Sequence, residues 1–446
     1  MVVPMNKVRK RSLSVLLLVA VAILGMGFYV IRLFIFGGEW AAAPFNATTY
    51  RNGMLTVGVV TDRNGVLLAD VQNGRRVFAE DTEVRRATLH SVGDSYGNVG
   101  TGALMVFAPE LMGYNIVTGS YSRTGAGRQI ALTIDSSLNA TALRALDGRR
   151  GAVMVSNYKT GEILCMVSSP TFDPLNPPGN VDAPAYEGVY VNRTIQSAYT
   201  PGSVYKLVTA AAAIENVWRL NERIFECNGE LETGRGTVTC PGEHGYLDFT
   251  QGMRVSCNVV FGQLALEMGG DVLAEYAEKF NLSGRITVSG IQTAEGIFES
   301  APSNTANLAW SGVGQFTNTV CPATMLRFIG AIANDGLAVE LHYLMKSGFS
   351  SIFPARTSRL MSTNTANELA SIIELRNRDS FPNLEIYAKS GTAQVGGGLD
   401  PHAWYVGYIT NEDFPLAFVV IVENGGGGFA VASPIANRVL QEAIKG

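Results

Sequence analysis

A long uncharged segment near the amino terminus dominates the pattern of hydrophobic and polar positions along the chain. It runs from Ser12 to Ile31, is interrupted by Arg32 and continues as apolar residues to Phe36, after a basic cluster within residues 7–11. About 20 apolar residues suffice for a helix to cross a bilayer, and basic flanks stay on the cytoplasmic side. The pattern predicts a cytoplasmic tail over residues 1–11, a single transmembrane anchor over residues 12–36, and an extracytoplasmic remainder.

A cleaved signal peptide is the alternative interpretation of this segment. The small residues 41–43, all alanine, would suit a cleavage site. However, the apolar core of a signal peptide is usually only about 7–15 residues long, which is shorter than the segment seen here. The sequence therefore favours an uncleaved anchor in the cytoplasmic membrane.

Two further apolar patterns predict regular structure beyond the anchor. Residues 152–156 and 163–167 form two short apolar runs around a polar connection, which is typical of a β-hairpin. Residues 207–214 form a continuous apolar run directly after a Pro-Gly pair, which indicates a buried helix. Because 446 residues are too many for one ordinary core, we expect two units outside the membrane, over residues 37–145 and 146–446.

Composition narrows the class of protein. Hydrophobic residues make up 47% of the chain and charged residues 16%, which allows a large core, and a net charge of −4 gives no reason to expect nucleic acid. The chain has four histidines, and they are scattered without a metal-ligand spacing: His90, His244, His342 and His402. We therefore expect no metal and no cofactor.

The cysteines leave two alternatives open. Cys227 and Cys240 bracket a loop rich in glycine and threonine, and a disulfide across it would add roughly 3 kcal/mol of stability. Two unbridged thiols are equally compatible with the sequence. Cys165, in an apolar run, and Cys321, beside a proline, are typical of buried free thiols.

The start of the predicted 207–214 helix carries the most informative chemistry. Ser203 and Lys206 are three positions apart, and positions i and i+3 share one face of a helix. A serine hydroxyl is a poor nucleophile until a nearby base takes its proton, which a neutral lysine amine at this spacing can do. The two residues are therefore a candidate nucleophile and base.

The same spacing occurs a second time, at Ser156 and Lys159, and Lys159 also begins a K-T-G sequence. This second match falls on the connection of the predicted β-hairpin, where no helix starts behind the serine. We expect it to carry no chemistry.

Two downstream motifs distinguish Ser203 from the second match. Residues 256–258 form an S-x-N sequence, and residues 389–392 form K-S-G-T in front of a strand-like segment. Two other S-x-N sequences, at Ser137 and Ser362, lie in polar segments typical of helix starts. The order S-x-x-K, S-x-N, K-[ST]-G is the active-site signature of penicillin-binding proteins and serine β-lactamases.

Over nearly its full length the chain resembles the class B penicillin-binding proteins, the monofunctional transpeptidases of peptidoglycan synthesis. Besides the three motifs, the likeness rests on residues 61–69, 132–135, 151–155, 168–174 and 403–408. The short 37–145 unit is similar to a compact subgroup without C-terminal accessory repeats. The resemblance implies an α/β (α+β) transpeptidase domain over residues 146–446, with a five-stranded antiparallel sheet flanked by helices. It also implies that residues 37–145 form a small pedestal.

The resemblance implies a role for each catalytic residue. Ser203 attacks the carbonyl between the two terminal D-alanines of a stem peptide, and Lys206 accepts its proton. Burial and the charge of Lys389 are expected to keep the Lys206 amine neutral. Ser256 relays a proton to the leaving amine, and Asn258 forms hydrogen bonds with Lys206 and the substrate backbone.

The resemblance also implies how the substrate is held. The backbone N–H groups of Ser203 and Thr392 form an oxyanion hole. Gly391 lets the substrate approach the strand closely, and the hydroxyls of Ser390 and Thr392 bind the terminal carboxylate.

The function implied by the resemblance is a serine-type D,D-transpeptidase that cross-links stem peptides in cell wall synthesis and binds β-lactams covalently. Its implied partner is a polytopic glycan polymerase in the membrane. A D,D-carboxypeptidase would use the same residues but pass the acyl group to water. A membrane-bound β-lactam sensor is the non-enzymatic alternative, although a tail of eleven residues leaves no room for a cytoplasmic output domain.

Overall fold

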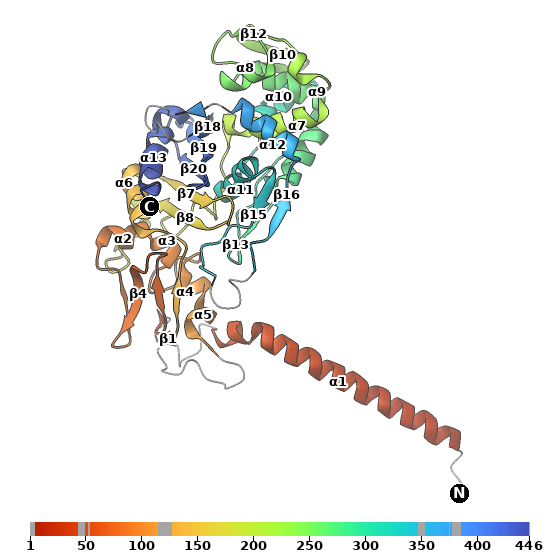
Figure 1. The fold of residues 1–446 in the computed structure, drawn as a ribbon, viewed down its shortest axis with the longest axis vertical. Coiled ribbons are helices and arrows are strands. Elements are labelled where there is room, and N and C mark those ends of the chain that lie inside the picture. Colours follow the sequence, from red (N-terminus) through yellow and green to blue (C-terminus); the bar gives the residue numbers. More distant parts are fainter. Residues whose placement is uncertain are drawn as a thin grey trace.

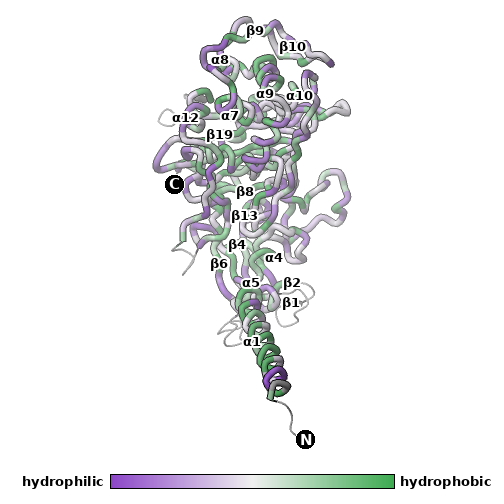
Figure 2. The backbone as a smooth tube through the Cα atoms, turned by 90° about the vertical axis from the view of Figure 1, so that its right-hand side faces the viewer, coloured by the Kyte–Doolittle hydropathy of each residue, from purple (hydrophilic) through white to green (hydrophobic). Residues whose placement is uncertain are grey.

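The computed structural model describes residues 5–42, 50–51, 54–114, 127–346, 353–373, 375–376 and 385–445. A single long helix, α1 (Met5–Ala41), projects from one end of an elongated body (Figure 1). Its segment Val8–Ala41 contains an 18-residue window with a mean hydropathy of 2.6 and no buried residue, so the helix is long and apolar enough to cross a membrane. Figure 2 shows this apolar character along most of α1. The predicted anchor over residues 12–36 lies within this helix.

A small sheet lies between α1 and the larger body (Figure 1). Its strands run in the order β5-β4-β3-β6, with β3 and β6 parallel and the other neighbours antiparallel. The strands are β3 (Val59–Thr61), β4 (Leu67–Gln72), β5 (Arg75–Phe78) and β6 (Gln129–Ala131). Four short helices complete this unit: α2 (Thr82–Ala87), α3 (Leu89–Val92), α4 (Ala103–Val106) and α5 (Ala108–Met112). A two-stranded ribbon, β1 (Tyr50–Arg51) and β2 (Met54–Leu55), accompanies it. We call this unit the pedestal.

The larger body is built on an antiparallel sheet of five long strands in the order β18-β19-β20-β7-β8. These strands are β7 (Gly151–Asn157), β8 (Ile163–Ser169), β18 (Ile386–Ala393), β19 (His402–Ile409) and β20 (Leu416–Val422). A two-residue strand, β17 (Leu375–Arg376), pairs with the start of β18. Every residue of β20 is buried, as expected for a central strand covered on both faces. The five-stranded sheet implied by the resemblance is confirmed.

Helices cover both faces of the sheet. Helices α6 (Ser136–Leu146) and α13 (Gly428–Ala443) pack on one face, where their apolar residues share a core with alternate sheet residues. Helix α11 (Pro322–Ala333) packs against β7, β19 and β20. The predicted buried helix after residue 206 is α7 (Lys206–Asn216), whose first eight residues are all buried. The boundary placed at residues 145 and 146 stays a prediction.

The remaining elements form a helical layer and a peripheral lobe farthest from α1 (Figure 1). The helices are α8 (Phe249–Arg254), α9 (Asn258–Lys279), α10 (Ala306–Val313) and α12 (Thr363–Ile372). The peripheral lobe contains β9 (Phe225–Cys227), β10 (Glu230–Thr233), β11 (Gly236–Thr239) and β12 (Gly245–Leu247). Short ribbons are β13 (Thr287–Val288) with β14 (Ile291–Gln292), and β15 (Leu337–Val339) with β16 (Thr357–Arg359). Single 3₁₀ turns lie at Pro184–Tyr186, Gly202–Tyr205 and Leu220–Glu222.

A buried carboxylate connects the pedestal to the sheet body. Asp62 is 1% exposed, and one of its oxygens accepts hydrogen bonds from the backbone N–H groups of Asn64 and Val66 at 2.8 and 2.9 Å. The other oxygen accepts from the N–H and the hydroxyl of Ser136, at the start of α6, at 3.1 and 2.7 Å. Since a buried carboxylate must be satisfied in this way, the β3–β4 turn and α6 are held in one arrangement.

A bidentate ion pair makes a second connection between the two units. Nε and Nη2 of Arg85 donate to the two carboxylate oxygens of Asp173 at 2.7 and 2.8 Å, and the side chains are only 8% and 10% exposed. Further Arg85 donors reach the carbonyl oxygens of Ala79 and Glu80. The hydrogen bonds from Arg85 hold the pKa of Asp173 at about 2.

Replacing Asp173 by alanine should therefore destabilise the full-length protein by about 3 kcal/mol, because the Arg85 charge would stay buried without its counter-ion. The measurement is the apparent melting temperature of the detergent-purified protein. The matched control is Glu187→Ala, which removes the partner of Arg150 from a pair whose side chains are 71% and 36% exposed. The control should cost about 0.5 kcal/mol, and equal shifts for the two variants would contradict the prediction.

Candidate active site

The turn that carries Ser203 packs directly on strand β18. Gly202–Tyr205 forms a 3₁₀ turn that leads into α7, so Ser203 stands at a helix start as the sequence predicted. Gly202 has a φ of +55°, and a Cβ there would lie 2.8 Å from the carbonyl oxygen of Thr392. Only glycine combines this backbone conformation with so close an approach. The indole N–H of Trp404 donates to the carbonyl of Thr200 at 2.9 Å and fixes the preceding residues.

Gly391 makes the same contact from the side of the strand. A Cβ at Gly391 would lie 2.8 Å from the carbonyl oxygen of Pro201 and 3.0 Å from Cγ1 of Val204. The close approach at Gly391 in the structure is thus made by the turn that bears the serine. The two glycines together set the height of Ser203 above β18.

The Lys206 amine is fully buried and its hydrogen bonds all go to the S-x-N segment. Its Nζ lies 2.6 Å from the carbonyl oxygen of Ser256, 3.2 Å from Ser256 Oγ and 2.7 Å from Asn258 Oδ1. Burial lowers the pKa of Lys206 well below its usual value, and the charge of Lys389 lowers it further. A neutral amine can donate its two hydrogens to the two nearer oxygens and keep its lone pair as a base.

The hydroxyl of Ser256 lies between the two lysines. Lys389 donates to Ser256 Oγ at 2.8 Å and to the carbonyl oxygen of Ser390 at 2.9 Å. Because Ser256 Oγ accepts from Lys389, its own hydrogen is available to Lys206 or to a substrate atom in the pocket. The arrangement offers a path for a proton from Lys206 through Ser256.

The S-x-N segment is held by local backbone structure at the start of α9. Ser256 has a φ of +56°, a left-handed conformation that is uncommon for a residue with a side chain, and Cys257 is the N-cap residue of α9. Asn258, the first residue of the helix, donates from Nδ2 to the carbonyl oxygen of Thr239 at 2.9 Å. The Asn258 amide is therefore fixed with its oxygen toward Lys206.

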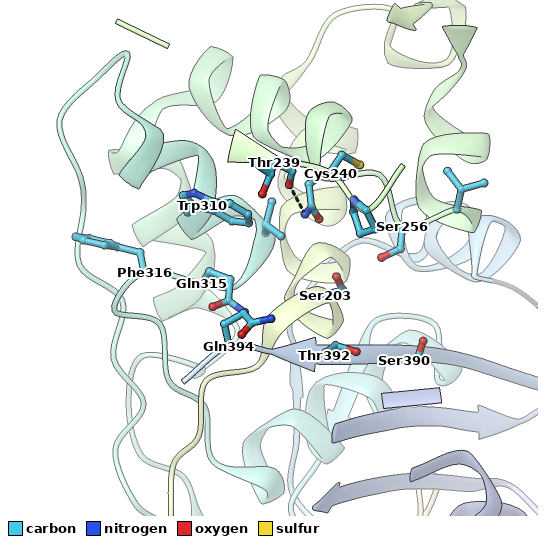
Figure 3. A pocket seen from close by; sticks show the side chains of 14 residues that line it. Ser203, Thr239, Cys240, Ser256, Trp310, Gln315, Phe316, Ser390, Thr392 and Gln394 are labelled. Carbon is cyan, nitrogen blue, oxygen red and sulfur yellow. Dashed lines mark hydrogen bonds between the residues drawn. The ribbon is translucent and has the colours of Figure 1, made fainter. Parts of the chain in front are cut away.

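These residues open onto a pocket of about 620 Å³ (Figure 3). In Figure 3 Ser203 lies between the strand that bears Ser390 and Thr392 and the segment that bears Ser256. The pocket is lined by Ser203, Thr239, Cys240, Pro241, Val255, Ser256, Asn258, Trp310, Val313, Gln315, Phe316, Ser390, Thr392 and Gln394. The lining contains no lysine, arginine, histidine, aspartate or glutamate, so the positive charge at the site comes from lysines behind the pocket wall.

Strand β18 presents an edge at the pocket. Among the described residues, its neighbour on that side is β17, which pairs with Ile386 and Tyr387. Within the described part of the chain, no strand pairs with the stretch 390–393 on that side. The hydroxyl of Thr392 accepts a hydrogen bond from the N–H of Gly428 at 3.0 Å and keeps its own hydrogen for another partner. Such an edge can take up an extended peptide as an additional strand.

Sequence reasoning missed two glutamines at the end of this edge. Gln394 lies two residues beyond Thr392 and also lines the pocket. With its amide suitably oriented, Gln315 bonds the backbone C=O and N–H of Gln394 at 3.2 and 3.0 Å. The two-residue period of the strand through Ser390 and Thr392 was the signal that could have identified Gln394. No sequence signal pointed to Gln315, which comes from a separate segment.

The second S-x-x-K match lies apart from this site. Ser156 is a β7 residue, 1% exposed, so it lies inside the strand and not in the connection. Lys159 donates to Asn334 Oδ1 at 2.9 Å. Neither residue lines the pocket that contains Ser203.

The cysteines depart from one expectation of the sequence analysis. Cys227 and Cys240 are free thiols, so the disulfide considered for them is not formed. They lie with Cys257 and His244 in a group whose possible ligand atoms are all within 4.8 Å of one another. The sequence analysis did not identify this group, because its four members come from separate elements. Cys165 and Cys321 are buried free thiols, as predicted.

Comparison with known proteins agrees with this geometry. Residues 151–441 match the family model described as the penicillin binding protein transpeptidase domain. Peptidoglycan D,D-transpeptidase PbpA of Mycobacterium tuberculosis is 28% identical over 337 residues, which cover 67% of this chain and 67% of PbpA. Peptidoglycan D,D-transpeptidase MrdA of Haemophilus influenzae is 27% identical over 372 residues, which cover 71% of this chain and 56% of MrdA.

Solved structures show the same fold. The D,D-transpeptidase domain of a peptidoglycan glycosyltransferase from Eggerthella lenta superposes with a TM-score of 0.73 at 26% identity, over 87% of this chain and 98% of that one. Penicillin-binding protein A of Mycobacterium tuberculosis superposes with a TM-score of 0.75 at 24% identity, over 87% of this chain and 99% of that one. The match of the family model over most of the sheet body identifies the chain as a member of the penicillin-binding protein transpeptidase family.

Proposed function

We propose that this protein is a peptidoglycan D,D-transpeptidase that works through an acyl-enzyme on Ser203. The observation that carries the proposal is the buried Lys206 amine, bonded to Ser256 and Asn258 at the wall of the pocket that Ser203 lines. A serine that stands at a helix start beside a neutral amine has the parts that nucleophilic acyl transfer requires.

In the first half of the reaction, Ser203 Oγ attacks the carbonyl carbon between the two terminal D-alanines while Lys206 takes the hydroxyl proton. Backbone N–H groups of Ser203 and Thr392 stabilise the oxyanion, a contribution of typically about 3 kcal/mol per donor. The C–N bond then breaks, and the proton moves from Lys206 through Ser256 to the nitrogen of the leaving D-alanine. The products are an ester on Ser203 and free D-alanine.

In the second half, an amine of a neighbouring stem peptide attacks the ester carbonyl. It gives its proton to the Lys206–Ser256 pair, the C–O bond to Ser203 breaks, and the serine recovers the proton. A new amide joins the two stems. A β-lactam follows only the first half, because ring opening leaves no separate leaving group to make room for the acceptor.

Substrate binding follows from the edge of β18. An extended donor peptide can pair with the stretch 390–393 and place its terminal carboxylate at the hydroxyls of Ser390 and Thr392. Lys389 is close behind them and supplies positive charge. The uncharged walls near Trp310 and Phe316 leave a second arm of the pocket for the acceptor.

The membrane anchor indicates where the proposed enzyme works. The basic residues at the start of α1, within residues 7–11, support an amino terminus in the cytoplasm and a catalytic body outside the cytoplasmic membrane. Helix α1 and the pedestal are then the surfaces available to a polytopic glycan polymerase, the partner that would supply nascent glycan.

Substitution of Ser203 by alanine should abolish covalent labelling by a fluorescent penicillin, because the attacking hydroxyl at the start of α7 is lost and the Ser256 hydroxyl is already bonded by Lys206 and Lys389. The measurement is in-gel fluorescence of the full-length protein in detergent. The matched control is Ser156→Ala, at the second S-x-x-K match, which should label like the wild type. Labelling of the Ser203→Ala protein would refute the assignment of the nucleophile.

Lys206→Arg should slow penicillin acylation by about 10³-fold, because a guanidinium stays protonated and cannot act as a base. The second-order rate constant of acylation is the relevant measurement. Lys159→Arg, which alters the lysine of the second match, serves as the control and should react at the wild-type rate. Equal rates for Lys206→Arg and the wild type would exclude Lys206 as the base.

The purified chain, supplied with lipid-linked precursor and a glycan polymerase, should produce cross-linked stem dimers. Mass spectrometry of digested product counts dimers against D-alanine released without cross-linking. Ser203→Ala in the same mixture sets the background. Release of D-alanine with no dimers would favour the carboxypeptidase alternative, and absence of both products with normal penicillin labelling would favour the sensor.

A further inference from the structure

Three cysteines and one histidine meet directly behind the S-x-N segment. Cys227 ends β9, Cys240 follows β11, His244 precedes β12, and Cys257 is the N-cap of α9. One possible ligand atom from each residue lies within 4.8 Å of the others. Four separate elements therefore bring thiol and imidazole groups to a single point.

Three of the six distances in this cluster match the edges of a zinc-centred tetrahedron. With Zn–S bonds of about 2.3 Å and a Zn–N bond of about 2.0 Å, tetrahedral angles place two sulfurs about 3.8 Å apart and a sulfur and a nitrogen about 3.5 Å apart. The Sγ atoms of Cys240 and Cys257 are 3.9 Å apart. His244 Nδ1 is 3.4 Å from Cys227 Sγ and 3.5 Å from Cys240 Sγ.

The surroundings of the cluster are those of a closed structural site. Cys227 and Cys257 are fully buried, and Cys240 and His244 are partly buried. The backbone N–H of Asn258 donates to Cys240 Sγ at 3.3 Å, the kind of contact that stabilises a metal-bound thiolate. Four protein ligands of the Cys₃His type complete the coordination of zinc without a water molecule.

A disulfide is the competing outcome for these cysteines. It would join only two of the three sulfurs at about 2.05 Å, and would leave the third thiol and the imidazole without a role. A single metal ion engages all four groups, and three of their six separations already fit it. The geometry therefore favours metal over a disulfide.

We propose that Cys227, Cys240, His244 and Cys257 bind one Zn²⁺ ion, and that this ion holds the S-x-N segment in its active position. Cys257 lies between Ser256 and Asn258, so an ion bound to it anchors both residues that contact Lys206. The zinc site does not depend on the proposed function. The effect of the zinc ion on acylation does rest on that function.

The peripheral lobe explains why a metal is needed there. It consists of two two-stranded ribbons, β9 with β12 and β10 with β11. In its four strands the buried residues are Phe225, Cys227, Val238 and Leu247, whereas Tyr246 is 72% exposed, so the core of the lobe is small. Small units of this kind commonly depend on a structural metal for their stability. The zinc ion would tie both ribbons to the start of α9.

The test uses the full-length protein, purified in detergent with a reductant and without chelator. Elemental analysis should give about one Zn²⁺ per chain, and replacement by Co²⁺ should produce a thiolate-to-cobalt charge-transfer band. Cys227→Ser, a change outside the S-x-N segment itself, should lose the metal and slow penicillin acylation about tenfold. The matched control Cys165→Ala, at a buried thiol outside the cluster, should keep the zinc content and the acylation rate of the wild type.

Several outcomes would overturn the proposal. One is a metal-free wild type in which mass spectrometry finds two of the three cysteines joined. Another is full zinc content in both Cys227→Ser and His244→Ala. If these variants do not fold, removal of the metal from the wild type by a chelator should slow acylation about tenfold, and addition of Zn²⁺ should restore the original rate. Unchanged acylation of the metal-free protein would refute the positioning role. Zinc content is also measured on Ser203→Ala, where it should be normal even if the proposed enzymatic function is wrong.

Discussion

The active site depends on the burial of one lysine amine. Lys206 has no exposed surface, and such a group is tolerated only if its polar atoms find partners. Those partners are Ser256 and Asn258, at the start of another helix. Helices α7 and α9 must therefore dock with the S-x-N segment over the amine. The same burial that constrains the packing lowers the pKa of the lysine, so one interaction supports both the fold and the chemistry.

Strand β18 is the second element on which the site is built. It carries Lys389, which approaches Ser256 from the sheet side, and it supports the turn that bears Ser203. Glycines at 202 and 391 allow this turn and the strand to approach within van der Waals contact. Because β18 pairs with β19 along its whole length, the proposed nucleophile rests on the main sheet of the molecule. The unpaired edge of the same strand remains available for a substrate.

The elongated shape separates the anchor from the chemistry. Helix α1 and the pedestal occupy one end, and the peripheral lobe occupies the other (Figure 1). Thr239 at the end of β11 and Cys240 line the pocket, so the pocket borders this lobe. Two buried polar connections, at Asp62 and at the Arg85–Asp173 pair, hold the pedestal against the sheet body. The lobe at the far end has little core, and the proposed zinc ion would give it the rigidity that the sheet gives to β18.

Local patterns determined much of this protein from the sequence alone. The anchor, the β7–β8 hairpin and helix α7 follow from runs of apolar residues, and the three motifs follow from the order of a few residue types, because each needs only neighbouring positions. The tertiary structure decided which groups touch. Lys389 meets Ser256 across a separation of 133 residues, and Gln315 reaches the end of β18. Ser156 is buried inside a strand, and four dispersed ligands form one cluster. Such contacts could not be predicted, because they depend on how distant segments pack and not on any pattern within one segment.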